Sequence, residues 1–514
     1  MPKVSALSPT GVPAVVTPRV GASPLDTDNA RTYAGPMGAA ANMSLGRKHM
    51  APAQRAGRLT DQTIEGETVG QLQDSLQGEL LRPDDDAYDA TRRVFNGMID
   101  HRPAMIARCA VASDVIRGVT FAREHGLPLS VRGGGHSIAG TAVCEGGLML
   151  DLSGLKGIRV DPARRLAQAQ PGLTLGEFDR ETQAFGLAMP TGVVSVTGLA
   201  GLTLGGGVGW LNGKHGLACD NLLSADVVTA DGRLLTASAD EYADLFWGLR
   251  GGSGNFGVVT SFTYRLHPVG PVLAGGLTYP PEQAREALRF YHDFAANCPD
   301  ELSTVASIGV GDDGRPFVAV AVCYCGDLAA GERLLQPLRA FGPPMKDGIQ
   351  PMAYCALQSG GDAGFPPDRL HYWKAGWLKN LSDGAIEVLL RFAAEKPSPA
   401  TGIALQQMHG AAARVDPTAT AFPHRGGNLY DFLLLSQWSD PAESEANIRW
   451  TRAFFEAMEP FLERGVYVND LGDEGDDRVR AAYGSNYDRL TAVKQEYDPT
   501  NLFRVNQNIR PAAS

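Results

Sequence analysis

The sequence predicts an α+β protein of two domains that follow a flexible N-terminal segment. The chain has 514 residues, which is more than one hydrophobic core ordinarily holds. Up to about residue 270, short β-rich runs alternate with glycine turns and a few helical segments. Residues 271–465 instead contain longer amphipathic helices between strands. This change in pattern near residue 270 predicts the division into two domains.

Several elements are predicted from local signals, in chain order. Residues 1–68 are rich in Pro, Ala, Gly, Ser and Thr, cannot bury enough apolar surface, and are expected to be a flexible extension. Strands are expected at 127–133 and within 147–172, followed by a helix at 174–186 with Thr174 as its N-cap. Residues 225–238 read as a hairpin around an Asp-Gly turn. Further helices are expected within 281–298 and 441–465, and strands at 371–380 and 427–439.

Composition and charge exclude several functional classes. The net charge of −11 argues against nucleic acid or an anionic membrane as a partner. The sequence has no apolar run long enough to span a membrane and no hydrophobic region of a secretory signal, so we expect a cytoplasmic protein. Its seven cysteines have neither CxxC nor zinc-like spacing, which predicts buried reduced thiols and no metal site. The oligomeric state stays open.

Three familiar motifs can be set aside. Gly252, Gly254 and Gly257 match the GxGxxG pattern, but a strand rather than a helix is expected after them, so the pattern does not indicate a dinucleotide-binding Rossmann unit. Neither GxxxxGK[ST] nor GxSxG occurs in the chain, which leaves a phosphate-binding P-loop and a serine hydrolase without support.

The glycines suggest a different ligand site. They gather at 132–140, 198–216 and 251–257, where backbone must approach a ligand closely. Backbone N–H groups in such turns can hold a pyrophosphate without a cationic side chain. A flat ring system could lie on the side-chain-free surface, with His136 of "SVRGGGHSIAG" against it.

Five motifs, in order, resemble a known family: "SVRGGGHSIAG", "TGLAGLTLGGGVGWL", "KHGLACDNLLSADVVTADG", "DLFWGLRGGSGNFGVVT" and "VKQEYDPTNLFRVNQNI". They are similar to the vanillyl-alcohol-oxidase superfamily, and within it to the berberine-bridge-enzyme-like flavoprotein oxidases. The resemblance implies a PCMH-type FAD-binding domain at 69–270 and an α+β substrate domain at 271–465, with an antiparallel sheet covered by helices. It also implies a segment at 466–514 that returns to the FAD-binding domain.

The resemblance also implies how FAD is held. The family's histidine bonds covalently to the 8α carbon of the flavin, and His136 occupies its position; neutral imidazole is a suitable nucleophile. Many relatives add a cysteinyl bond, but that position is Val194 here, and neither Cys144 nor Cys219 replaces it on alignment. A single covalent link through His136 is therefore expected. The other expected cofactor-binding residues are Arg132, Gly133, Gly134, Gly135, Ser137, Gly140, Thr197, Gly198, Gly201, Leu204, Gly205, Gly206, Val259, Asn506 and Asn508.

Catalysis is assigned by the same resemblance. Tyr467 and Asn469 form the family's Y-x-N element, in which the tyrosine takes a substrate proton; an ordinary phenol needs help to do so. Some subfamilies use a glutamate or another tyrosine, so the base stays open. The expected function is an FAD-dependent oxidase that transfers hydride from a small alcohol, amine or phenol to flavin N5, with O2 as the second substrate and H2O2 as product. The alternatives are a flavin dehydrogenase, a tailoring oxygenase that uses a flavin–oxygen adduct, and a flavin-holding protein without turnover.

Overall fold

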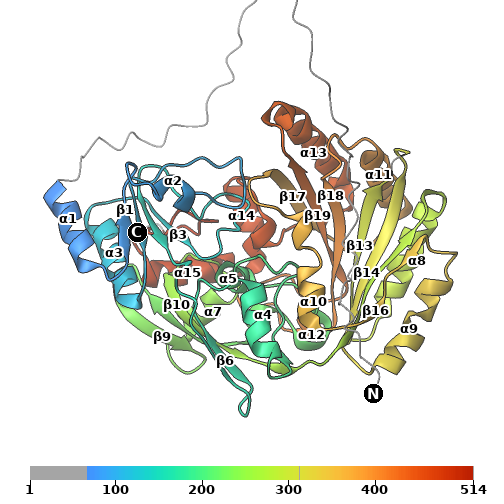
Figure 1. Ribbon diagram of the computed structural model, residues 1–514, viewed down its shortest axis with the longest axis horizontal. Helices are drawn as coiled ribbons and strands as arrows, with labels where there is room; N and C mark the ends of the chain where they lie inside the picture. The colour runs from blue at the N-terminus through green and yellow to red at the C-terminus, as the bar shows by residue number, and fades with distance from the viewer. Residues whose placement is uncertain (1–65, 312, 513–514) are drawn as a thin grey trace, which may run out of the picture.

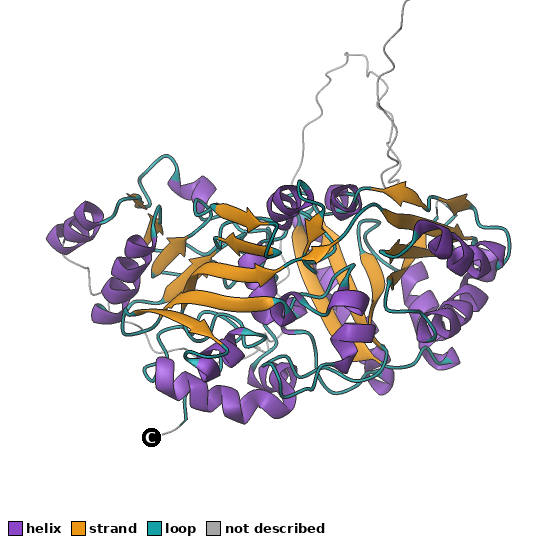
Figure 2. Ribbon diagram, turned by 90° about the horizontal axis from the view of Figure 1, so that it is seen from below, coloured by secondary structure: helices purple, strands orange, loops and turns teal. Residues whose placement is uncertain are grey.

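The computed structural model describes residues 66–311 and 313–512, so most of the predicted N-terminal extension lies outside the described residues. Residues 66–68, which the prediction placed in that extension, are the first turn of helix α1 (Gly66–Ser75). The chain forms two large halves side by side (Figure 1). Strands and helices are mixed in both, which confirms the predicted α+β class (Figure 2).

The first sheet follows α1 in the chain. Its order is β1-β2-β4-β3, with β1 antiparallel to β2 and with β4 parallel to both β2 and β3. Helix α3 (Ala112–Glu124) packs on it through Val115, Val119 and Ala122. Its strands are β1 (Glu79–Leu81), β2 (Met105–Arg108), β3 (Leu129–Arg132) and β4 (Leu148–Asp151), and the short helix α2 (Tyr88–Thr91) lies between β1 and β2.

The second sheet is antiparallel and completes the N-terminal half. Its order is β5-β6-β10-β8-β9. The strands are β5 (Ile158–Asp161), β6 (Leu166–Ala169), β8 (Leu222–Val228), β9 (Leu234–Ser238) and β10 (Val258–Arg265); β7 (Leu187–Ala188) pairs separately with β11 (His267–Pro268). The helices of this half are α4 (Leu175–Gln183), α5 (Leu199–Gly205), α6 (Asn212–His215), α7 (Ala243–Leu249), α14 (Asp476–Tyr483) and α15 (Tyr487–Tyr497).

The third sheet is also antiparallel and forms the other half. Its order is β15-β12-β14-β13-β18-β19-β17, with β16 paired to β12. The strands are β12 (Val272–Tyr279), β13 (Leu302–Val310), β14 (Pro316–Tyr324), β15 (Lys346–Asp347), β16 (Gln350–Met352), β17 (Leu370–Leu378), β18 (Gly402–Met408) and β19 (Leu429–Trp438). The helices are α8 (Ala284–Ala296), α9 (Leu328–Ala340), α10 (Tyr354–Ser359), α11 (Asp383–Ala394), α12 (Gly410–Arg414) and α13 (Ser444–Met458).

Local sequence explains several of these elements. Thr174 caps α4: its hydroxyl accepts from the Glu177 N–H at 3.4 Å, and the Glu177 carboxylate accepts from the Thr174 N–H at 2.9 Å, which confirms the predicted N-cap. β8 and β9 form the predicted hairpin. Gly257 leads directly into β10 rather than into a helix, which confirms that the GxGxxG pattern here is not a Rossmann turn.

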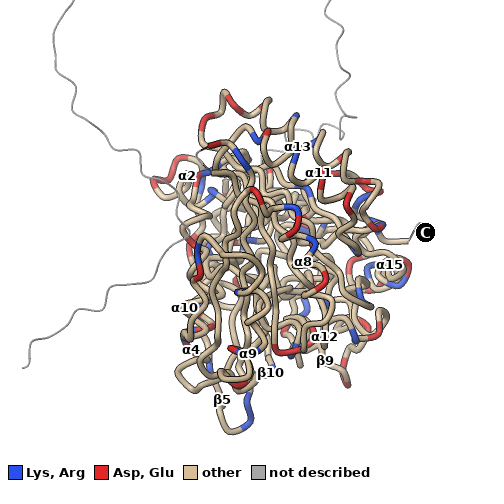
Figure 3. Tube along the Cα trace, turned by 90° about the vertical axis from the view of Figure 1, so that its right-hand side faces the viewer, with Lys and Arg blue, Asp and Glu red and all other residues tan. Residues whose placement is uncertain are grey.

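The two halves share part of their interior. Helices α8, α9, α11 and α13 pack on one face of the third sheet, away from the N-terminal half, while the chain returns through α14 and α15 to the N-terminal half (Figure 1). The largest core cluster contains Phe262 of β10 together with Trp377 of β17 and Phe422 of the loop between α12 and β19. Acidic and basic residues lie interspersed along the outer elements (Figure 3). None of the described helices is long and apolar enough to cross a membrane.

Candidate active site

A cavity of about 340 Å³ lies between the two halves and takes residues from both. Its N-terminal-half wall includes Gly133, Gly134, Gly135, His136, Ser137, Thr197, Gly198, Gly201, Leu204, Gly254 and Val259. Its other wall includes Phe365, Trp373, Gln406, Asp431, Leu433, Leu435, Tyr467, Asn469 and Asp470, and Asn506 of the C-terminal segment lies beside Gly254. Thus 13 of the predicted site residues meet at one cavity, although they come from distant parts of the chain.

Two glycine loops touch each other in this wall. A Cβ on Gly134 would lie 2.4 Å from the Gly198 Cα, and a Cβ on Gly198 would lie 2.6 Å from the Gly134 nitrogen. Gly135 also has a φ of +69°, which glycine adopts without strain. The close approach of these two backbones therefore requires glycine on both sides.

His136 follows the first of these loops and is held by an aromatic ring. The Phe95 ring stacks on the imidazole with centroids 4.0 Å apart and planes 16° apart. The Phe95 ring also stacks on His371 at 4.4 Å, so Phe95 lies between two imidazoles. Burial lowers the pKa of His136 to about 4. The imidazole at the cavity is therefore neutral near pH 7, which is the form that can act as a nucleophile.

Tyr467 and Asn469 lie together behind the three consecutive glycines 205–207, which we call the second glycine run. The Tyr467 hydroxyl accepts hydrogen bonds from the Gly207 N–H and from the Asn469 side-chain amide, both at 2.7 Å. Burial raises the pKa of Tyr467 above its usual value. The hydroxyl is thus firmly placed at the cavity wall, in its neutral form.

Five predicted residues do not line the cavity. Gly205 and Gly206 lie behind it and leave room for Asn469 and Tyr467: a Cβ on Gly205 would be 2.0 Å from the Asn469 Oδ1. The Arg132 guanidinium donates to the Thr91 carbonyl and lies 3.9 Å from Asp151 on the neighbouring strand. The remaining two are Gly140, which packs against Ile99, and Asn508, whose side-chain oxygen is buried without a hydrogen-bond partner among the described residues.

The cavity also holds a carboxyl pair that was not predicted from the sequence, Asp431 and Asp470. Asp431 lies on β19, Asp470 ends the turn 468–470, and their side chains are hydrogen-bonded to each other. Two carboxyls can bond in this way only when they share a proton. Burial raises the pKa of both, well above the usual value for Asp431 and to about 6 for Asp470. The sequence did hold one sign of a functional carboxyl here, because Asp431 is the single acidic residue in the apolar run "LYDFLLL".

Lys374 on β17 is engaged away from the cavity. Its ammonium pairs with Glu474 at 2.6 Å, and it does not line the cavity. Trp373, the preceding residue on β17, lines the cavity instead, as expected for adjacent residues that face opposite sides of a strand.

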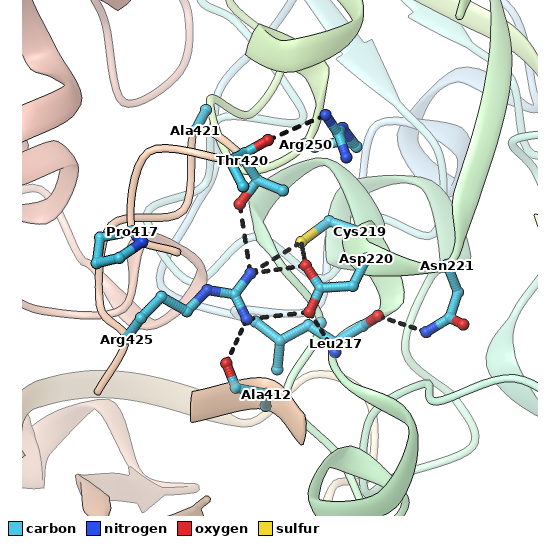
Figure 4. Close-up of polar contacts among 12 residues, drawn as sticks. Leu217, Cys219, Asp220, Asn221, Arg250, Ala412, Pro417, Thr420, Ala421 and Arg425 are labelled. Atoms are coloured by element: carbon cyan, nitrogen blue, oxygen red, sulfur yellow. Dashed lines mark hydrogen bonds and ion pairs between the residues drawn. The ribbon is translucent and has the colours of Figure 1, made fainter. Parts of the chain in front are cut away.

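A buried polar cluster supports the second glycine run from behind (Figure 4). The Arg425 guanidinium pairs with the Asp220 carboxylate at 2.7 and 3.0 Å and donates to the Ala412 carbonyl at 2.7 Å. The adjacent Cys219 N–H donates to the Gly206 carbonyl at 2.9 Å. Burial raises the pKa of the Cys219 thiol. All seven cysteines are free; four are buried as predicted, whereas Cys298, Cys325 and Cys355 are only half-buried.

Comparisons with known proteins agree with this geometry. Residues 103–238 match the FAD binding domain family, and residues 466–510 match the berberine and berberine-like family. The (R)-6-hydroxynicotine oxidase of Paenarthrobacter nicotinovorans is 34% identical, over 86% of this chain and 98% of that protein. The FAD-linked oxidoreductase YgaK of Bacillus subtilis is 32% identical, over 85% of this chain and 97% of that protein.

The chain belongs to the berberine-bridge-enzyme-like flavoprotein oxidases. The crystal structure of 6-hydroxy-D-nicotine oxidase from Arthrobacter nicotinovorans superposes with a TM-score of 0.80 and 32% identity, covering 85% of this chain and 99% of that one. This match confirms the predicted PCMH-type fold. The protein is an FAD-linked oxidoreductase of the oxidase type, and members of this family named for their substrates act on small molecules.

The cavity residues fit FAD. No lysine or arginine is among the residues that line the cavity in the described part of the chain, so a bound pyrophosphate would depend on backbone N–H groups of the glycine loops and on nearby hydroxyls such as that of Ser137. The positions where a Cβ would stand on Gly201 and Gly254 are open. Asn506 of the returning C-terminal segment lies beside Gly254, and its buried side-chain oxygen has no hydrogen-bond partner among the described residues. The wall thus offers a bare surface for a flat ring and polar atoms at its rim.

Proposed function

We propose that this protein is an oxidase with FAD linked covalently through His136 alone, and that it oxidises a small alcohol, amine or phenol. The observation that carries the proposal is the neutral imidazole of His136 in the cavity, stacked on Phe95 and bordered by two glycine loops. When bound, the flavin accepts a hydride from the substrate and passes the electrons to O2, which gives H2O2.

The cofactor is proposed to be held by the predicted residues that line the cavity. Gly133, Gly134 and Gly198 supply close backbone contact, and Ser137 supplies a hydroxyl that is 2.8 Å from the Thr141 hydroxyl. Asn506 donates to the Gly254 carbonyl at 3.2 Å and so ties the C-terminal segment to the wall. The five predicted residues that do not line the cavity are proposed to support FAD binding indirectly, by shaping the loops that form its wall. They are Arg132, Gly140, Gly205, Gly206 and Asn508.

Tyr467 and Asn469 are the proposed catalytic pair, with Tyr467 placed to contact the substrate's O–H or N–H. Its hydroxyl already accepts two hydrogen bonds, which stabilise negative charge on that oxygen. The carboxyl pair on the same wall is a second proposed proton acceptor, and the pKa of Asp470, which burial raises to about 6, is better matched to neutral pH.

Acid precipitation tests the covalent link. The purified protein is expected to be yellow, and the colour is expected to stay in the precipitate. A flavin-bearing peptide that contains His136 is expected by mass spectrometry. In His136→Ala the pigment should be released into the supernatant. Release of all pigment from the unaltered protein, or a flavin attached to another residue, would contradict the proposal.

Reoxidation kinetics test the oxidase assignment against its alternatives. After anaerobic reduction with dithionite, mixing with air-saturated buffer should restore the oxidised spectrum within seconds and release one H2O2 per flavin. Slow reoxidation without peroxide would favour a dehydrogenase. A flavin–oxygen adduct with consumption of O2 into the product would favour an oxygenase, and failure of any alcohol, amine or phenol to bleach the flavin would favour a binding protein.

A further inference from the structure

The substrate side of the cavity carries negative charge without a matching cation. Among the described residues that line the cavity, Asp431 and Asp470 are the only acidic ones, and none is a lysine or an arginine. His136 is neutral because burial lowers its pKa to about 4. Asp431 and Asp470 are hydrogen-bonded to each other and share one proton, so the pair keeps one negative charge. An uncompensated charge in a buried site is unfavourable, and a bound cation relieves it.

The polar atoms beside this charge are aimed at the cavity. Asp431 is 1% exposed, and one of its carboxylate oxygens has no hydrogen-bond partner among the described residues. Gln406 lies directly opposite Asp431 in the β18–β19 register. The Gln406 side chain is 7% exposed, lines the cavity, and has no hydrogen bond to a described residue. Acceptors from two neighbouring strands thus converge on one spot.

The cavity wall around Asp431 and Gln406 is otherwise apolar and includes two aromatic rings. Leu433 and Leu435 follow Asp431 at every second position of β19 and therefore face the same side. Trp373 and Phe365 complete it, with ring centroids 6.4 Å apart. A sugar needs several hydrogen-bonding partners along its length, whereas this wall offers polar atoms mainly at one end.

We infer that the substrate is a small amine with a flat apolar body, whose nitrogen lies against Asp431, Asp470 and Gln406. This inference rests on the proposed function and narrows it. The amine enters as its ammonium form, and the carboxyl pair takes a proton from nitrogen. The adjacent carbon then loses a hydride, with its two electrons, to the enzyme's flavin, and the C–N bond becomes C=N. The flavin's electrons pass to O2, and water releases the imine as a carbonyl compound and an amine.

A matched charge series tests this inference. Benzylamine, benzyl alcohol and benzoate share one aromatic ring and differ in charge, and their binding to the oxidised holoenzyme at pH 7 can be followed by the change in flavin absorbance. We expect benzylamine to bind at least 10-fold more tightly than benzyl alcohol, and benzoate to bind most weakly. Equal affinities, or tightest binding of benzoate, would overturn the inference.

Two substitutions show whether the carboxyl pair is responsible. Asp431→Asn and Asp470→Asn should each weaken benzylamine binding at least 10-fold and change benzyl alcohol binding less than 3-fold. Glu387→Gln, which removes an exposed carboxylate on α11, is the control for net charge and should change neither. Retention of the amine preference in both aspartate variants would contradict the inference.

Flavin bleaching separates this inference from the proposed function. Anaerobic mixing with a panel of aryl-alkyl amines, their alcohol counterparts and xylobiose should bleach the flavin with an amine and not with xylobiose. Bleaching by xylobiose alone would refute the amine inference and leave the oxidase intact. Release of the flavin on acid precipitation would refute the proposed covalent link. It would not affect the amine inference, which the relative binding of benzylamine, benzyl alcohol and benzoate supports or overturns.

Discussion

At the scale of single residues, the orientation of the His136 imidazole depends on the ring beside it. Phe95 stacks on His136 at 4.0 Å, and an aromatic pair of this kind contributes about 0.5–1.5 kcal/mol. Phe95→Ala is therefore expected to slow covalent attachment of FAD about 2- to 10-fold. The fraction of pigment retained in acid precipitates over time measures this rate. Phe365→Ala removes another cavity ring that is 6.4 Å from Phe95 and should leave the rate unchanged.

The identity of the proton acceptor can be read from the pH profile. Because the pKa of Asp470 is raised to about 6, the carboxyl pair is neutral below that pH and can accept a proton above it. We expect kcat/KM to rise as the pH increases through about 6. Two titratable groups face Asp470. Asp431 is hydrogen-bonded to it, and Tyr467 lies near enough for the charge of Asp470 to help raise the pKa of the phenol.

Variants then separate the two candidates. Asp470→Asn should remove the rise near pH 6. Tyr467→Phe should keep it and lower kcat about 100-fold if the phenol contacts the reacting atoms. The same substitution leaves the Gly207 N–H and the Asn469 amide without their acceptor, which costs about 1–3 kcal/mol of stability. An unchanged kcat in Tyr467→Phe would remove Tyr467 from the chemistry.

At the scale of elements, α15 carries a buried ion pair that holds the C-terminal segment at the cavity. The Lys494 ammonium pairs with Asp498 at 2.7 Å with neither side chain exposed, and it also donates to the Asn255 and Phe503 carbonyls. Removing one partner of a buried pair costs about 3–5 kcal/mol. Asp498→Asn should lower the thermal midpoint by several degrees and reduce flavin content. Glu445→Gln, which breaks an exposed pair on α13, should change the midpoint little; equal effects would contradict this role.

Elements whose signals are local were predictable from sequence, and contacts between elements were not. Thr174 and Glu177 are three residues apart, so their capping box is readable in the sequence. Asp431 and Asp470 meet only because β19 and the turn 468–470 pack together. Arg132 stands beside the glycines in sequence, but it faces its register partner Asp151 on β4. Motif position therefore located the His136 loop, while side-chain direction required the fold.

At the scale of the whole molecule, polar contacts join the halves that share the cavity. The Ser195 hydroxyl donates to Asp362 at 2.6 Å, and the Gln358 amide donates to Asp179 at 2.9 Å. Burial raises the pKa of Asp179 to about 7. Together with the Asp220–Arg425 pair, these contacts fix the third sheet against the loops that hold His136 and Tyr467. The substrate wall and the cofactor wall are therefore positioned by one connected structure.

The Asp220–Arg425 contact is an ion pair with a fully buried guanidinium, and it gives the sharpest test of that coupling. The Arg425 side chain is 0% exposed and that of Asp220 is 12% exposed. Arg425→Met should lower the free energy of unfolding by about 3 kcal/mol, because Asp220 then stays buried without its partner. The loop 217–220 should also shift at Gly206 and Gly207, which it holds through backbone hydrogen bonds, and so slow flavin reduction by substrate.

Denaturant unfolding and anaerobic reduction, measured on the same samples, check both effects. Adding Asp220→Asn to Arg425→Met removes the unpaired charge and should recover part of the lost stability, since the two sites are coupled. Arg449→Met, which breaks an exposed pair on α13, should leave both measurements near the unaltered values. If Arg425→Met lowered stability but left flavin reduction unchanged, the cluster would support the fold without positioning the cavity.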